Sequence, residues 1–364
     1  MIRVEVRLGA RSYPVVVAAG GLDAVGAAAG AAAGPAGGAA LVADGGLPDG
    51  VVNRVRASLD AAGLRPICLR LRGERAKRLA TVERLCAAFR QGGVDRDGVV
   101  VALGGGVVGD VAGFAAAVYL RGIALVHCPT TLLAMVDSAL GGKTAVNLAA
   151  AKNQLGTLHQ PRAVLCDPEL LRSLPRRDRR AAFGEIVKYG MVSDPDLLGL
   201  LTELQGDARP DDPRRLETLI ARCCACKAEV VGDDEHDHGR RAILNYGHTV
   251  GHALEATCGY GRLRHGEAVA IGMRVAGRLS VELRGCPAAA IEEQDARLSD
   301  FGLGRLPAGL AVDPAAVLAA TRHDKKTKGG RTRWVLLEGP GRPTAGHVVP
   351  EAILRRHLQQ VLAG

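Results

Sequence analysis

Three histidines lie close together in the sequence, and their spacing suits a metal site. His248 and His252 are four residues apart in Asn-Tyr-Gly-His-Thr-Val-Gly-His, and His265 follows in Arg-His-Gly-Glu. Residues four apart on a helix share a face, so both can point into one cleft while His265 approaches from the next helix. Thr249 stands where the zinc-protease motif His-Glu-x-x-His has its general base, so peptide hydrolysis is not expected. Polar helix residues bonded to the backbone remain the alternative.

A carboxylate that can complete this site occurs in Gly-Glu-Ile-Val-Lys-Tyr. Glu185 and Lys188 are three residues apart and share one face of a helix. A surface ion pair is the ordinary explanation for such a couple. Two histidines, one carboxylate and an open position are, however, a ligand set of catalytic zinc.

A glycine-rich turn follows an apolar run in the first half of the chain. Residues 99–103 lead into Gly-Gly-Gly-Val-Val-Gly-Asp at 104–110, and a helix is expected from Val111. Backbone N–H groups and the helix dipole converge at such a turn and can hold a pyrophosphate. The acid usually found about 20 residues later is missing, but Asp44 after an earlier strand can reach the ribose. A merely tight turn is the alternative.

Polar and cationic side chains are concentrated between residues 137 and 153, around Lys143, Lys152 and Asn153. Ammonium groups supply charge and amides supply directed hydrogen bonds, which together suit an oxyanion, whereas an exposed polar loop is the alternative. Further cations favour a substrate with phosphate and carboxylate groups. They are Arg121, Lys188, Lys227, Arg241 and Lys326.

Composition narrows the class of protein. The net charge of +9 comes from scattered arginines, and aromatic residues make up only 3%, so a nucleic-acid interface is not expected. The most apolar region, 111–136, is broken by Arg121, His127 and Pro129, so a membrane span is not expected either. Nine scattered cysteines and the absence of an apolar leader favour a reducing cytoplasm. Cys223 and Cys226 lie in a helical pattern and are expected to be buried thiols.

The elements that must position these residues follow from hydrophobic patterns. Short β-branched runs alternate with helical stretches and predict a parallel sheet with crossover helices. These runs are 40–43, 66–71, 98–103, 123–127 and 163–166, and 1–8 alternates like a half-buried strand. After residue 174 the pattern becomes helical over 183–201, 215–231, 243–257 and 267–283. A late strand at 331–337 and a closing helix at 350–362 complete the expectation.

As an ordered set, these motifs resemble 3-dehydroquinate synthase over nearly the whole chain. The matching segments are 104–110, 129–131, 137–147, 152–153, 184–188, 244–252, 265–269 and 324–326. The resemblance implies an NAD-dependent sugar phosphate cyclase. It implies an α/β Rossmann-like nucleotide-binding domain at 1–174 and a mainly α-helical metal- and substrate-binding domain at 175–364.

The resemblance also implies roles for individual residues. It makes Glu185, His248 and His265 the ligands of Zn²⁺, with Co²⁺ as a substitute. Cofactor contacts are implied for Asp44, Glu74, Lys77, Gly105, Gly106, Val107, Asp110, Thr130, Thr131, Lys143, Lys152 and Ser173. Substrate contacts are implied for Asp137, Lys143, Asn153, Lys188, Lys227, Arg241, Asn245, His252 and Lys326. Arg121 matches a position that reaches the phosphate site of a neighbouring subunit, so a homodimer is expected.

The implied reaction converts 3-deoxy-D-arabino-heptulosonate 7-phosphate to 3-dehydroquinate and phosphate, a step of the shikimate pathway to aromatic amino acids. NAD⁺ accepts a hydride from C5, phosphate is eliminated, the hydride returns, and ring opening and an intramolecular aldol step follow. Zinc lowers the hydroxyl pKa and polarises the developing carbonyl.

Three positions depart from the family pattern and concern specificity. Ala145 and Ala151 replace residues that are often glycine, and Asp237 replaces a usual glutamate; tuning rather than loss is expected. Arg241 and Lys227 keep cations suited to a substrate carboxylate, which argues against 2-deoxy-scyllo-inosose and valiolone-type synthases. Aminodehydroquinate synthase and, less favoured by these lysines, a metal-dependent polyol dehydrogenase remain alternatives, as does the choice between primary and specialised metabolism.

Overall fold

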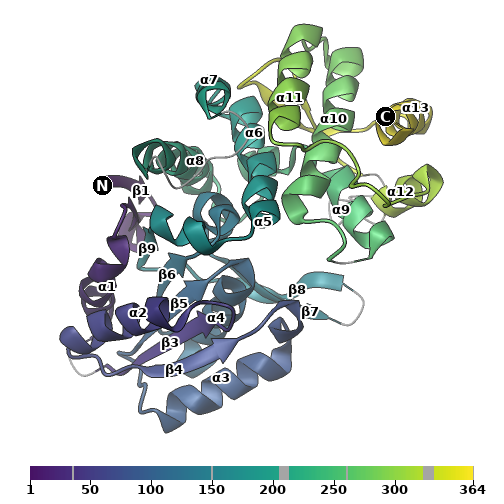
Figure 1. The fold of residues 1–364 in the computed structure, drawn as a ribbon. Helices are drawn as coiled ribbons and strands as arrows, with labels where there is room; N and C mark the ends of the chain where they lie inside the picture. Colours follow the sequence, from purple (N-terminus) through teal and green to yellow (C-terminus); the bar gives the residue numbers. More distant parts are fainter. Residues whose placement is uncertain (35–36, 149–150, 205–212, 260, 323–331, 364) are drawn as a thin grey trace. The chain divides into compact units, whose positions relative to one another are not determined.

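The apolar runs of the first half form the strands of a seven-stranded sheet (Figure 1). The computed structural model of the chain describes residues 1–34, 37–148, 151–204, 213–259, 261–322 and 332–363. The strand order is β1-β2-β9-β6-β5-β3-β4, and all neighbours are parallel except β1 and β2. The strands are β1 Ile2–Val6, β2 Tyr13–Val17, β3 Ala39–Asp44, β4 Ile67–Leu71, β5 Val99–Gly104, β6 Ala124–Pro129 and β9 Ala163–Cys166.

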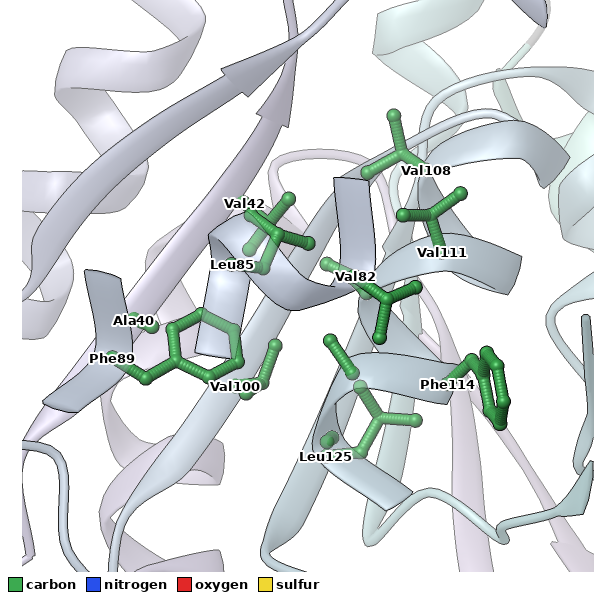
Figure 2. Packing of buried hydrophobic residues seen from close by; sticks show 14 of the residues in the cluster. Ala40, Val42, Val82, Leu85, Phe89, Val100, Val108, Val111, Phe114 and Leu125 are labelled. Atoms are coloured by element: carbon green, nitrogen blue, oxygen red, sulfur yellow. The ribbon is translucent and has the colours of Figure 1, made fainter. Parts of the chain in front are cut away.

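Helices α1 to α4 lie between these strands in the chain, and α8, which follows the last of them, packs on β1 and β2. These helices are α1 Val25–Ala32, α2 Asp49–Ala61, α3 Leu79–Gln91, α4 Gly106–Val118 and α8 Pro213–Asp233. Short helical turns occur at η1 Gly9–Arg11, η2 Gly21–Ala24, η3 Glu74–Ala76, η4 Tyr119–Arg121, η5 Ala134–Ser138 and η6 Pro168–Ser173. Leu85 and Phe89 of α3 and Val111 of α4 pack on Val42 and Val100 of the sheet (Figure 2). The predicted parallel α/β architecture is therefore confirmed.

The polar segment after η5 forms a hairpin that the sequence pattern did not predict. Strands β7 Lys143–Leu148 and β8 Ala151–Leu158 pair in antiparallel fashion. Val146 is fully buried against α4, whereas Lys143 and Asn153 are exposed. Because only part of the hairpin is buried, its sequence lacks the sustained alternation that identifies a strand.

Contacts between elements divide the chain into two compact units. The first contains Met1–Leu174 and Pro210–His236, and the second contains Pro175–Arg209 and Asp237–Gly364. The sequence predicts continuous domains at 1–174 and 175–364, and the units differ from that division in one segment. Helix α8 belongs to the first unit because it packs on β1, β2, η5 and η6.

The second unit is mainly helical, as predicted. Its helices are α5 Arg176–Ala181, α6 Phe183–Val192, α7 Asp196–Glu203, α9 His248–Cys258, α10 His265–Arg284, α11 Ala288–Asp300, α12 Pro314–Thr321 and α13 Glu351–Ala363. A 3₁₀ turn, η7 Arg240–Asn245, and a hairpin, β10 Trp334–Leu337 with β11 Pro343–His347, complete it. Val250 and Leu254 of α9 pack with Ile271 and Val275 of α10 in its core.

Two predicted helices have different ends in the structure. The helix expected over 183–201 is divided into α6 and α7, because Pro195 lacks a backbone N–H and restricts the residue before it. The helix expected from residue 243 begins only at His248, because Gly247 adopts φ +80°. Within the described ranges, none of the helices is both long enough and apolar enough to cross a membrane.

Candidate metal and nucleotide sites

Three helices of the second unit bring together a carboxylate and two imidazoles. Glu185 comes from α6, His248 is the first residue of α9, and His265 is the first residue of α10. The start of α10 is fixed by Glu267, whose carboxylate accepts the backbone N–H of Arg264 at 2.9 Å and the guanidinium of Arg177 at 2.7 and 2.8 Å. These contacts hold the first turn of α10 in place and thereby fix the backbone position of His265.

The distances among the three groups suit a tetrahedral metal ion. Oε1 of Glu185 lies 3.4 Å from Nε2 of His248 and 3.5 Å from Nε2 of His265. Metal bonds of 2.0–2.2 Å arranged tetrahedrally place neighbouring ligand atoms about 3.4 Å apart. Glu185 is fully buried, and its Oε1 has no hydrogen-bond partner among the described residues. A buried carboxylate oxygen without a donor is costly, and a bound cation would satisfy it.

The second polar atom of each of these residues is already engaged. Lys188 donates to Oε2 of Glu185, and this ion pair is buried rather than on the surface. Nδ1 of His248 lies 3.2 Å from the carbonyl oxygen of Tyr246, and Nδ1 of His265 lies 3.1 Å from Oε2 of Glu255. In a neutral ring with Nδ1 donating, the lone pair of Nε2 would point toward Glu185, as binding of a metal ion there requires.

The electrostatic environment of the cluster favours positive charge. Burial opposes ionisation of Glu185, but the Lys188 ammonium and His265 outweigh it and lower the pKa of Glu185 to about 2. Burial also disfavours a charged His265, but its contacts with Glu185 and Glu255 outweigh this effect and raise its pKa to about 10. A cation at Nε2 of His265 would therefore replace a proton.

The other predicted residues of this unit surround the cluster. His252 is exposed, and its ring centroid lies 5.4 Å from that of His248 and 6.1 Å from that of His265. Arg241 is 3% exposed, and Asn245 donates to the carbonyl of Ala242 at 3.1 Å. Both belong to η7, which packs on α6. Lys326 lies outside the described residues.

In the first unit, the predicted cofactor residues gather at the carboxyl ends of parallel strands. Asp44 ends β3, Gly104 ends β5, and Thr130 and Thr131 follow β6. The chain leaves β3 toward β4 and then returns to β5 on the other side, so strand order reverses between β3 and β5. Ligands of open α/β sheets bind at such a reversal.

The start of α4 provides a backbone cradle at this edge. Gly105 is extended and Gly106 begins the helix. A Cβ on Gly105 would lie 3.0 Å from Cγ2 of Thr131, and one on Gly106 would lie 3.0 Å from Oγ of Ser138. Glycine at both positions therefore avoids crowding against Thr131 and Ser138 at the start of the helix, beside the Val107 amide, where a pyrophosphate site is expected.

Ion pairs and hydrogen bonds connect the other predicted cofactor residues. Lys77 pairs with Asp110 in α4, and burial raises the pKa of Asp110 although Lys77 lowers it. Glu74 accepts from Nδ2 of Asn147 at 2.9 Å, and Oδ1 of Asn147 accepts the backbone N–H of Asn153 at 3.0 Å. Asn147 thus links a predicted cofactor residue to a predicted substrate residue, a role that sequence spacing did not suggest.

The remaining predicted residues of the first unit occupy separate positions. Lys227 of α8 donates to the carbonyl oxygen of Asp137 at 2.7 Å and to Oδ1 of its carboxylate at 2.6 Å. Lys143 and Lys152 lie on the β7–β8 hairpin, and Ser173 ends η6, where it donates to the Leu170 carbonyl at 3.0 Å. Arg121 is exposed and has φ +73°, a strained backbone conformation for a non-glycine residue.

Two family models together match most of the chain. The family model described as 3-dehydroquinate synthase N-terminal matches residues 68–181, and the one described as 3-dehydroquinate synthase C-terminal matches residues 182–327. The chain belongs to the 3-dehydroquinate synthase family. A 3-dehydroquinate synthase of Gloeobacter violaceus is 46% identical, over 98% of this chain and 99% of that protein. One from Nostoc punctiforme is 43% identical, over 98% of each.

Solved structures show the same fold in related cyclases. A 2-deoxy-scyllo-inosose synthase complexed with carbaglucose-6-phosphate, NAD⁺ and Co²⁺ superimposes with a TM-score of 0.88 at 29% identity, covering 99% of this chain and 100% of that one. ValA, the 2-epi-5-epi-valiolone synthase of Streptomyces hygroscopicus subsp. jinggangensis 5008 with NAD⁺ and Zn²⁺ bound, gives 0.83 at 27% identity, covering 96% of each chain. The resemblance to 3-dehydroquinate synthase inferred from the motifs is thereby confirmed.

Proposed function

We propose that the chain converts 3-deoxy-D-arabino-heptulosonate 7-phosphate to 3-dehydroquinate and phosphate, with NAD⁺ and a divalent metal ion as resident cofactors. One observation carries the proposal. The cluster of Glu185, His248 and His265, whose ligand atoms lie within 4.8 Å of one another, occurs in a chain that is 46% identical to a 3-dehydroquinate synthase over 98% of its length. The solved 2-deoxy-scyllo-inosose synthase and 2-epi-5-epi-valiolone synthase are more distant, at 29% and 27% identity.

Glu185, His248 and His265 are the proposed ligands of the metal ion. Two imidazole nitrogens and one carboxylate oxygen form a common set for catalytic zinc, which supports Zn²⁺ as the native ion. Co²⁺ accepts similar ligands, and it accompanies NAD⁺ in the solved 2-deoxy-scyllo-inosose synthase. When bound, the metal would supply Lewis acidity at a substrate hydroxyl, and NAD⁺ would supply reversible hydride transfer.

The proposed nucleotide site is the carboxyl edge of the parallel sheet. Gly105 and Gly106 would let a pyrophosphate approach the amides at the start of α4, and Asp44 at the end of β3 would bind a ribose hydroxyl. The Lys77–Asp110 pair keeps a buried carboxylate compensated beside this helix. Together these groups would keep NAD⁺ bound as a resident cofactor.

Cations and His252 are proposed to act on the substrate. Lys227 and Arg241 supply positive charge for its carboxylate and phosphate groups. His252 is an exposed imidazole beside the metal cluster, so it can take a proton from the substrate or return one. Lys188 donates to Glu185 in this structure, so its proposed first role is to balance the negative charge of that carboxylate.

A homodimer and a cytoplasmic location are part of the proposal. Arg121 is exposed on a strained turn, and it lines a cavity of about 470 Å³ together with Arg96 and Arg162. An exposed arginine in this position could contact the phosphate site of a neighbouring subunit. All nine cysteines are free thiols, as expected in a reducing compartment.

A substrate panel tests the proposed function. Purified protein with Zn²⁺ and NAD⁺ is given the heptulosonate phosphate, its amino analogue, sedoheptulose 7-phosphate or glucose 6-phosphate. Release of inorganic phosphate with formation of 3-dehydroquinate from the first compound is the expected result. Turnover of only one of the others would assign the chain to a specialised cyclase. Net accumulation of NADH with glycerol-like alcohols would instead indicate a polyol dehydrogenase.

A further inference from the structure

Glu255 contacts a proposed metal ligand, yet it lies outside the segments that carry the family resemblance. Its Oε2 lies 3.1 Å from Nδ1 of His265, and the residue is only 9% exposed. Glu255 belongs to α9, two helical turns after His248, whereas His265 begins α10. The contact therefore joins the two helices that supply the imidazole ligands.

The contact determines which nitrogen of His265 is free. A neutral imidazole has one N–H and one lone pair, and a carboxylate at Nδ1 holds the proton there. The lone pair then lies on Nε2, which is 3.5 Å from Oε1 of Glu185. A carboxylate acceptor also makes the imidazole more basic and hence a stronger metal ligand.

The two imidazoles differ in this respect. The Nδ1 of His248 faces the neutral carbonyl oxygen of Tyr246 at 3.2 Å. His265 faces a charged acceptor and is also the more exposed of the two, with 29% of its side chain accessible against 11% for His248. His265, which is less enclosed by packing than His248, is thus the ligand held by a charge-assisted hydrogen bond.

We propose that Glu255 is a positioning residue for the metal site: it fixes the tautomer and orientation of His265 and thereby increases the affinity of Glu185, His248 and His265 for a divalent metal. This inference rests on the metal site of the proposed function. It does not depend on the identity of the substrate.

A competing arrangement must be distinguished. Ligand atoms of His252, Glu255 and His265 also lie within 4.8 Å of one another, so Glu255 could bind a second ion directly. In that arrangement His265 would have to give up its Nδ1 proton. The 3.1 Å separation is that of a hydrogen bond and needs no second ion.

The experiment measures metal binding without substrate. Metal-free wild-type protein, E255Q and E255A are titrated with Zn²⁺ against a competing chelator, and with Co²⁺ followed by visible absorption. We expect one ion per chain in all three proteins. Zn²⁺ affinity should fall about 10–100-fold in E255A and less in E255Q, whose amide oxygen can still accept from Nδ1. The Co²⁺ spectrum should change in E255A, because the orientation of His265 is lost.

Two controls separate positioning from a structural role. E293Q removes an exposed carboxylate on α11 and should leave affinity and spectrum unchanged. Thermal unfolding of the metal-free variants shows whether each is folded, and E255Q, which keeps the side-chain volume, carries the test if E255A does not fold.

Unchanged Zn²⁺ affinity and Co²⁺ spectrum in the folded Glu255 variants would overturn the inference. So would two ions in the wild type and one in E255Q, because Glu255 would then be a ligand itself. A wild-type protein that binds no metal would instead contradict the proposed function, so the two failures can be told apart.

Discussion

Glu185 is the residue on which the metal cluster depends. Its carboxylate is fully buried, one oxygen is paired with Lys188, and the other lies between two imidazole nitrogens. Transferring a carboxylate from water to a protein interior costs several kcal/mol unless other charges compensate it. Lys188 provides part of that compensation, and the proposed metal would provide the rest.

Removing a ligand should reduce metal content together with rate. Glu185→Gln keeps the size of the side chain but removes its charge, and His265→Ala removes a donor nitrogen, so each variant should lose at least about 100-fold in metal affinity. Elemental analysis of the purified variants checks this, with the exposed Glu292→Gln as control. Full metal content in both variants would contradict the ligand assignment.

The Lys188–Glu185 pair should show strong energetic coupling. Lys188→Met leaves a buried carboxylate without its ammonium partner, so metal-free protein should lose about 3–5 kcal/mol of unfolding free energy. The double variant Glu185→Gln, Lys188→Met should lose much less than the sum of the single losses, because no buried charge remains. Denaturant unfolding of the metal-free proteins measures the cycle, and additive losses would show that the pair is not coupled.

At the scale of elements, glycines determine how closely the ligand-bearing helices approach. Gly184 and Gly266 adjoin Glu185 and His265. A Cβ on Gly266 would overlap the carbonyl oxygen of Ala181, and one on Gly184 would overlap the carbonyl oxygen of Gly266. Backbone therefore contacts backbone where α6 meets α10, and this approach sets the separation of the two ligands.

Adding a methyl group at this crossing should disturb both packing and metal binding. Gly266→Ala forces α10 away from α5 and should lower the unfolding free energy by about 3 kcal/mol and weaken Zn²⁺ binding. Gly199→Ala on α7 is the matched control: nothing lies within 4 Å of its added Cβ, so a neutral or slightly stabilising effect is expected. Equal effects of the two variants in denaturant unfolding would refute the argument.

Sequence patterns predicted six of the seven strands of the large sheet and missed β2 Tyr13–Val17 and the β7–β8 hairpin. Strands such as Val99–Gly104 are buried on both faces, so their composition identified them. The hairpin of β7 and β8 was missed because its exposed lysines and asparagines resemble a loop. The partner of His265 was also missed, because a contact between α9 and α10 depends on how two helices pack. Glu255 does lie three residues after His252, and that spacing was the available signal.

At the scale of the whole molecule, the predicted chemistry is divided between two units. The first contains the glycine turn of α4 and the Lys77–Asp110 pair, and the second contains Glu185, His248 and His265. Each unit also has buried groups outside these sets. His127 of β6 is one of them: it is 6% exposed, and burial, reinforced by His159, lowers its pKa to about 4.

This buried imidazole should make the protein less stable in acid. The unfolded chain binds a proton at His127 near pH 6.5 and the folded chain only near pH 4, so stability is lost as the pH falls between these values. From pH 7 to pH 5 the loss should be about 2 kcal/mol. Urea unfolding of metal-free protein at both pH values checks this. His127→Gln should show a loss smaller by that amount, whereas the exposed His236→Gln should match the wild type.

The first unit is not complete when its main segment has been synthesised. When residue 174 has left the ribosome, β1 and β2 still lack α8, and Asp137 still lacks the ammonium of Lys227. The chain contributes 175–209 to the other unit before it returns with 210–236. A gene fragment that ends at residue 174 therefore encodes a sheet without one of its helices, and the complementary fragment encodes α8 without its sheet. Only a fragment that extends to residue 236 encodes all of the first unit.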